Sequence, residues 1–224
     1  MTSPHCPKRG LAASSTVAVA RGIALFFAGF TVLNLTGELV HRGFDASIWW
    51  IDLRFFPSIL SRMLLLGLAA VLFDFVRDPV ATGTRQRLRQ VSAVLFMTLS
   101  MIDAIRFAML IYSGDIRSTF PVPVSLAVSA SFAVVLLGTQ LANNVTALQT
   151  VRRSQWILSG TTFGACLIAF PLMQIFCFGW TDYRRPADAA VVFGCRVYRN
   201  GEPSVALADR VHRGVDLYRS GLCD

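Results

Sequence analysis

Charged residues are scarce in this chain of 224 residues. Asp, Glu, Lys and Arg make up 15% of it, whereas soluble domains carry about 25%. Hydrophobic residues make up 54%, and the mean hydropathy is +0.55. This balance excludes an ordinary soluble globular protein for most of the chain. The apolar residues come in long blocks separated by short charged loops, which predicts a bundle of membrane-spanning helices.

Lysine is almost absent, because the 21 basic residues include only Lys8. The net charge of +8 is therefore carried by arginine. These arginines lie between apolar blocks, as in "VRDPVATGTRQRLRQ" and "TVRRSQW". Charge in that position sets the orientation of a membrane protein more often than it binds a polyanion. We expect the lipid bilayer, and no nucleic acid, as a partner.

Cysteine motifs are also missing. The five cysteines form no CxxC pair and no Cys/His cluster, so neither a metal site nor a disulfide framework is predicted. The two cysteines inside apolar blocks, Cys166 and Cys177, are interpreted as small packing residues. The first apolar block is too long for a signal-peptide core and no small-residue cleavage site follows it. We expect it to remain as the first membrane helix.

Five apolar blocks are each close to the ~20 residues that cross a bilayer. They cover residues 22–40, 57–76, 91–112, 121–141 and 156–180. The predicted fold class is a mainly α membrane protein with a five-helix transmembrane bundle. Trp156 and Trp180 bracket the last block and are expected near the headgroups. Small residues such as Gly160 and Gly164 favour close helix contact in lipid.

The basic residues near the ends of the blocks predict the orientation. One side carries nine of them: Lys8, Arg9, Arg21, Arg77, Arg85, Arg87, Arg89, Arg152 and Arg153. The other side carries three: Arg42, Arg54 and Arg117. The heavier side should be cytoplasmic. We therefore expect residues 1–21 to form a cytoplasmic tail, and the chain after Trp180 to lie outside the inner (cell) membrane.

The segment "DASIWWIDLRFFPS" joins the first two blocks and places aromatic residues beside Asp52 and Arg54. Two interpretations are open. The segment lies along the outer interface of the membrane, or it is a simple aromatic belt.

Four charged residues fall inside the apolar blocks: Glu38, Arg62, Asp103 and Arg106. With the predicted orientation, each lies in the outer half of its helix. Asp103 and Arg106 share a face because they are three residues apart. Intramembrane charges face the bundle interior, pair with one another and mark functional sites. The alternative is an ion-pair network that only fixes helix packing.

The end of the chain has a different pattern. Ala189–Phe193 is a short apolar run with central valines, typical of a strand buried in a parallel sheet. A loop with Gly194 and Gly201 follows. The next helix is predicted to begin at Pro203 and Ser204 and to stop at Gly221. Its apolar positions are Leu207, Val211, Val215 and Tyr218.

Strand, loop and helix form the first half of a βαβ unit, which binds anions where the loop meets the helix. The residues predicted to contact an anion are Gly194, Arg196, Arg199, Ser204 and Arg210. The alternative is that Ser204 is only an N-cap and the arginines are solvated. The spacing is not GxGxxG, so the dinucleotide fingerprint is absent. No nucleophile and base pair is visible, and no catalytic residue or cofactor is assigned.

The stretch "DAAVVFGCRVYRNGEPSVALADRVHRGVDLYRSGL" resembles the opening of the ElyC/SanA/YdcF family (domain of unknown function 218). The matching positions are Gly194, Gly201, Pro203, Ser204, Leu207, Arg210, Leu217, Tyr218 and Gly221. The resemblance implies a Rossmann-like α/β domain tethered to the bacterial inner membrane. It also implies a role in the maintenance of the cell envelope and of peptidoglycan precursors.

The family pattern continues with a second strand, an S-G-G turn and a T-x-x-N segment, all of which would lie beyond Asp224. We therefore expect residues 181–224 to be an incomplete domain in which the helix forms without a sheet. One hypothesis is an envelope protein whose outer domain binds or processes an anionic metabolite and is inactive as truncated. The alternative is a non-enzymatic membrane protein, a small transporter or an assembly factor, with a vestigial C-terminal segment.

Overall fold

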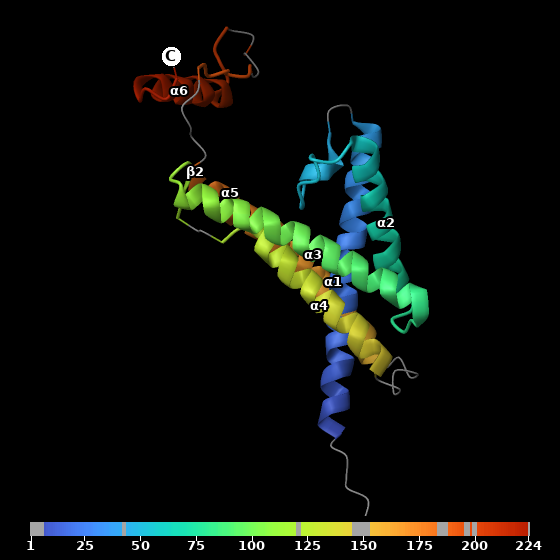
Figure 1. Cartoon of the computed structure of the whole chain (residues 1–224). Coiled ribbons are helices and arrows are strands. Elements are labelled where there is room, and N and C mark those ends of the chain that lie inside the picture. Colours follow the sequence, from blue (N-terminus) through green and yellow to red (C-terminus); the bar gives the residue numbers. More distant parts are fainter. Residues whose placement is uncertain are drawn as a thin grey trace, which may run out of the picture. The chain divides into compact units, whose positions relative to one another are not determined.

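The computed structural model describes residues 7–41, 44–119, 122–144, 153–182, 188–194, 198 and 201–223. The chain is mainly helical, and five helices are long and apolar enough to cross a membrane. They are α1 (Pro7–Val40), α2 (Ser58–Arg77), α3 (Gly83–Tyr112), α4 (Val124–Asn144) and α5 (Arg153–Gly179) (Figure 1). The predicted multi-pass helical membrane protein is confirmed at this level.

Two helices begin earlier than the apolar blocks indicate. The first begins at Pro7, where a tail was predicted, and α3 begins at Gly83 instead of residue 91. Hydropathy detects only the part of a helix that lies in lipid. The backbone hydrogen bonds of a helix continue through polar residues as well. Arg21, Arg85 and Arg89 therefore belong to helices and not to loops.

Helix α1 is the centre of the membrane unit and packs against α2, α4 and α5. It meets α5 at Gly22, where a Cβ atom would lie 2.5 Å from the Ser159 carbonyl oxygen and 2.6 Å from Thr162 Cβ. A Cβ at Gly160 or Gly164 would meet nothing within 4 Å. The predicted close helix contact through these two glycines is therefore wrong for the described residues, because they face away from the neighbouring helices.

Four aromatic rings form the centre of the core. Phe27 of α1, Phe96 of α3 and Phe132 of α4 surround Trp50, with ring centroids 5.2 to 5.9 Å apart. Trp50 comes from the segment that joins α1 and α2, which contains a 3-10 helix, η1 (Ala46–Ile48). Trp50 is 5% exposed, whereas Trp49 is 43% exposed. The segment is thus neither a simple aromatic belt nor purely interfacial, because one of its tryptophans inserts into the bundle.

Large apolar side chains cover the outer faces of the membrane helices. Leu39, Ile59, Leu66, Met109 and Ile168 are examples that are more than half exposed. Exposed apolar surface of this extent is unfavourable in water and favourable against acyl chains. The faces of the helices therefore fit the lipid bilayer as the solvent of this unit.

The chain divides into two compact units. The first unit contains α1, η1, α2, α4, α5 and α3 up to Met109. The second contains Leu110–Thr119 and the chain from Thr181 onward. Here β1 (Arg117–Ser118) pairs antiparallel with β2 (Thr181–Asp182), a pairing that the sequence analysis did not predict. The second unit also contains α6 (Val205–Arg219).

The structure does not contain the predicted strand Ala189–Phe193. Among the described residues the sheet consists of β1 and β2 alone, and Ala189–Phe193 is in neither. Val191 and Phe193 are exposed. A strand needs a neighbouring strand to hydrogen-bond with, and the described residues of this segment have none. The Rossmann-like sheet is therefore not confirmed, although the helix predicted to follow it is present as α6.

Candidate functional site

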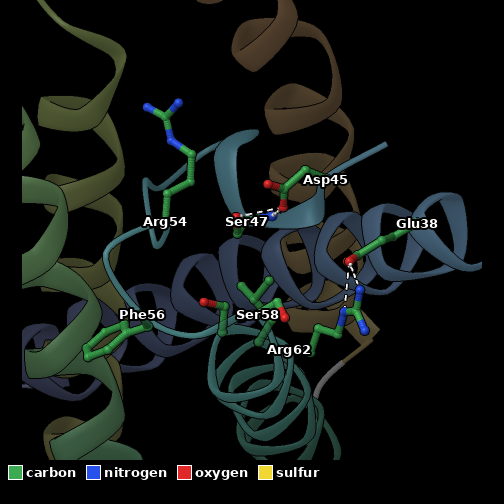
Figure 2. A pocket seen from close by; sticks show the side chains of 9 residues that line it. Glu38, Asp45, Ser47, Arg54, Phe56, Ser58 and Arg62 are labelled. Carbon is green, nitrogen blue, oxygen red and sulfur yellow. Dashed lines mark hydrogen bonds and ion pairs between the residues drawn. The ribbon is translucent and has the colours of Figure 1, made fainter. Parts of the chain in front are cut away.

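A polar pocket of about 360 Å³ lies where α1 ends and α2 begins (Figure 2). The η1 segment between these two helices forms part of its wall. The residues that line the pocket are Glu38, Asp45, Ser47, Arg54, Phe56, Ser58, Ser61, Arg62 and Leu65. Two of the four charges predicted inside the membrane, Glu38 and Arg62, are among them.

Glu38 and Arg62 form an ion pair across α1 and α2. The Arg62 Nε and Nη2 atoms donate to the same Glu38 oxygen, Oε1, at 2.8 and 2.6 Å (Figure 2). Glu38 lies near the C-terminal end of α1 and Arg62 in the second turn of α2, so the connecting segment brings them together. The Arg62 side chain is about half exposed. The pair is therefore accessible to a ligand or to solvent.

Asp45 is held at the start of η1 by Ser47. Its Oδ1 atom accepts from the Ser47 backbone amide at 2.9 Å and from the Ser47 hydroxyl at 2.6 Å. The hydroxyl hydrogen bond is the largest cause that lowers the pKa of Asp45, followed by the amide hydrogen bond. Both favour the charged form of the carboxyl group. Asp45 is therefore a fixed anion on the pocket wall.

Arg54 carries the second positive charge of the pocket and is paired with Asp52. Its Nε and Nη2 atoms donate to the two Asp52 oxygens at 3.0 and 2.7 Å. This side-chain contact is the main cause that lowers the pKa of Asp52. The Asp52 backbone amide in turn donates to Asp103 Oδ2 at 3.2 Å. The connecting segment is thereby tied to α3.

The predicted intramembrane network therefore divides into two. Asp103 accepts a hydrogen bond from the backbone of the connecting segment, and none of the hydrogen bonds or ion pairs among the described residues joins it to Arg106. Arg106 is exposed and takes part in none of the ion pairs found within the described ranges. The prediction of one inward-facing network is wrong for Arg106. A spacing of three residues places two side chains on one face, but it does not make them point at each other.

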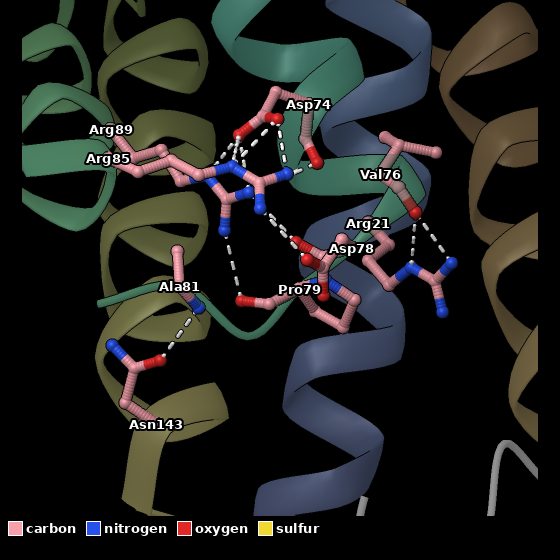
Figure 3. Close-up of polar contacts among 9 residues, drawn as sticks. All are labelled: Arg21, Asp74, Val76, Asp78, Pro79, Ala81, Arg85, Arg89 and Asn143. Atoms are coloured by element: carbon pink, nitrogen blue, oxygen red, sulfur yellow. Dashed lines mark hydrogen bonds and ion pairs between the residues drawn. The ribbon is translucent and has the colours of Figure 1, made fainter. Parts of the chain in front are cut away.

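A second polar cluster, which the sequence analysis missed, lies at the other end of α2 (Figure 3). Arg89 is 3% exposed, and its Nε donates to Asp74 Oδ2 at 2.8 Å. Its Nη atoms donate to the carbonyl oxygens of Asp74, Asp78 and Pro79 at 2.8 to 3.1 Å. Arg85 bonds both oxygens of Asp74 and reaches Asp78 at 2.9 Å. This cluster locks the turn between α2 and α3.

A sequence signal for this cluster existed. Asp74 and Asp78 are four residues apart, and so are Arg85 and Arg89, which places each pair on one side of the chain near a short connection. The hydropathy pattern predicts both arginines in a loop, whereas they lie in the first turns of α3. Arg21 is also a buried helix residue: it donates to the Val76 carbonyl oxygen at 2.6 and 3.0 Å and lies 4.1 Å from the Trp156 ring centroid.

The C-terminal helix has the predicted caps. The Ser204 hydroxyl accepts from the Leu207 amide at 3.3 Å, and Gly201 just before it has φ +83°. At the other end, Gly221 has φ +69° and the Leu222 amide donates to the Leu217 carbonyl oxygen. Only glycine adopts such angles without strain. Ser204 thus acts as an N-cap, as the alternative interpretation stated.

The other predicted anion-contacting residues are placed as follows. Arg210 donates to the Phe193 carbonyl oxygen at 3.4 Å, and Gly194 is exposed. Arg196 and Arg199 lie outside the described residues. In α6, a Cβ at Gly214 would lie 2.8 Å from Val192 Cγ2, so this glycine allows the segment before the loop to approach the helix.

Across the part of the chain that the structure describes, no three His, Cys, Asp or Glu side chains are grouped closely enough to hold a metal ion. Comparisons with family models, curated proteins and solved structures found no match to this chain. The resemblance to the ElyC/SanA/YdcF family therefore stays a prediction.

Proposed function

We propose that this chain is a membrane-anchored bacterial envelope protein of the ElyC/SanA/YdcF type. The five membrane helices anchor it in the inner membrane, with the N-terminus in the cytoplasm. The segment after Trp180 lies outside and takes part in binding an anionic envelope metabolite.

One observation supports this proposal: residues 190–193, although they form no strand, lie against α6. Val192 packs where Gly214 has no side chain, and Arg210 holds the Phe193 carbonyl oxygen. Helix α6, which follows in the chain, is capped by Ser204. Phosphate groups bind to βα units at this kind of junction, where backbone N–H groups and the helix dipole converge.

Reporter fusions test the topology. Fusions after Arg153 and after Arg185 should report opposite compartments, with the second outside the membrane. The excess of arginine on one side supports this orientation. If both fusions report the cytoplasm, the proposed position of the C-terminal segment is wrong.

Binding of a polyprenyl phosphate to the full chain in nanodiscs tests the ligand. We expect a variant with Arg196→Gln and Arg199→Gln to bind at least roughly a hundredfold more weakly, because each of the two charge-assisted hydrogen bonds is worth about 1.5 to 3 kcal/mol. Arg219→Gln, in the last turn of α6, is the control and should bind normally. Equal binding by both variants would contradict the proposal.

The pocket supports a second candidate function, which is carried out by the membrane unit and not by the C-terminal segment. Its charged lining comes from α1, α2 and the segment that joins them, and contains no residue of the C-terminal segment. A non-enzymatic transporter or assembly factor would need such a site. Removal of the chain after Trp180 separates the two: it abolishes the first function and leaves the second.

A further inference from the structure

The pocket between α1 and α2 has balanced charges. Two anionic side chains, Glu38 and Asp45, and two cationic ones, Arg54 and Arg62, line it. A ligand with one charge would be attracted by one pair and repelled by the other. A ligand that carries both charges, at separate ends, is attracted by all four. The lining therefore favours a zwitterion.

Each of these four side chains also has an unused hydrogen-bonding atom. Glu38 and Asp45 each use one carboxylate oxygen, Oε1 and Oδ1, which leaves Oε2 and Oδ2 without a partner among the described residues. Arg54 and Arg62 each use Nε and Nη2, which leaves both Nη1 groups without one in the same part of the chain. The pocket thus offers acceptors for an ammonium group and donors for a phosphate.

The position of the pocket along the helices fits the depth of lipid headgroups. It is formed where α1 ends and α2 begins, at one end of two membrane-spanning helices. Next to its charged residues in the chain are exposed apolar side chains, namely Leu39, Val40, Ile59 and Met63. Charged groups at the end of an apolar face match the border between headgroups and acyl chains.

We propose that this pocket binds a zwitterionic phosphate ester with a primary ammonium group, as in a phosphatidylethanolamine headgroup. The ammonium group contacts the free carboxylate oxygens of Asp45 and Glu38, and the phosphate contacts the free Nη1 group of Arg62. A volume of about 360 Å³ lies within the roughly 300 to 1,000 Å³ of ligand pockets. This site is independent of the C-terminal segment and of the function proposed for it.

Lipid retention by the full chain tests the proposal. The protein, purified and delipidated in detergent, is mixed with vesicles of equal parts phosphatidylethanolamine and phosphatidylglycerol, and retained lipids are counted by native mass spectrometry. We expect preferential retention of phosphatidylethanolamine. Asp45→Asn and Arg62→Gln should each lower it about tenfold, the loss of one charge-assisted contact. Asp78→Asn, at the other end of α2, is the matched control and should retain it normally.

Soluble O-phosphoethanolamine distinguishes the two sources of this headgroup. If it binds and the lipid does not, the natural ligand is soluble and the proposed chemistry holds. Equal retention of the two lipids by the unmodified chain, together with no binding of O-phosphoethanolamine, would overturn the proposal, as would equal losses in Asp45→Asn and Asp78→Asn. The unfolding temperature of each variant shows whether it is folded. If Arg62→Gln is not folded, Glu38→Gln is measured in its place.

Discussion

The two ends of α2 carry polar clusters of similar composition that differ in how completely their charged groups are hydrogen-bonded. At the Arg77 end, Asp74, Arg85 and Arg89 satisfy one another, and Arg89 also bonds three backbone carbonyl oxygens. At the Pro57 end, Glu38 and Arg62 pair through a single carboxylate oxygen beside an open pocket.

This difference separates a structural cluster from a binding site. Arg89 is buried and has no room for a ligand, whereas the side chain of Arg62 is about half exposed and keeps a free N–H group. A buried charge stabilises only when every partner is in place. An exposed pair adds little to stability and is free to exchange partners.

Arg89→Leu should destabilise the membrane unit most. It leaves the Asp74 carboxylate with Arg85 alone and removes the Arg89 donor from three carbonyl oxygens, of which only that of Asp74 keeps the Asp78 amide. Breaking a buried pair costs about 3 kcal/mol or more. Chemical unfolding in micelles measures this. Arg87→Leu is the control, since Arg87 is exposed on the same helix. If the two variants are equally stable, the polar cluster at the Arg77 end of α2 does not stabilise the membrane unit.

Gly22→Ala measures how much stability is lost when only helix packing is disturbed and no charge is changed. The new Cβ would lie 2.5 Å from the Ser159 carbonyl oxygen, so α1 and α5 must separate. Overpacking of this kind costs about 1 to 3 kcal/mol. In Gly29→Ala, on the same helix, the Cβ meets nothing within 4 Å and stability should be unchanged or higher. A silent Gly22→Ala would show that the helices are not tightly packed there.

Arg62→Leu should lower stability by less than about 1 kcal/mol, because the pair with Glu38 is exposed on the arginine side. The same unfolding measurement applies. The comparison with Arg89→Leu is the decisive one. A loss as large as that of Arg89→Leu would erase the distinction between the two ends of α2.

Acid should weaken the connecting segment at the Pro57 end by the smallest amount. Ser47 lowers the pKa of Asp45, and Arg54 lowers the pKa of Asp52, relative to the unfolded chain. Their contribution is therefore complete above the unfolded pKa of about 3.9 and is lost as the pH falls through the lower folded values. The unfolding temperature should decrease between about pH 5 and pH 2. The decrease should be smaller in the double variant Asp45→Asn and Asp52→Asn than in the unmodified chain. An identical decrease would show that these two carboxyl groups do not cause it.

The sequence alone determined the membrane helices. Long apolar blocks can satisfy their backbone groups in lipid only as helices, so hydropathy is enough to find them. It also determined the ends of α6, because Ser204 and Gly221 act on their own neighbours along the chain. Capping is a local interaction that needs no other element.

Only the tertiary structure decided which polar groups meet. Periodicity places Asp103 and Arg106 on one face of α3, but the connecting segment gives Asp103 its partner. Trp50 is in the core and Trp49 outside, although they are neighbours in the sequence. Ala189–Phe193 has the composition of a strand and is not paired. In each case the outcome depends on the rotation and offset of a second element, which residue spacing within one segment does not contain.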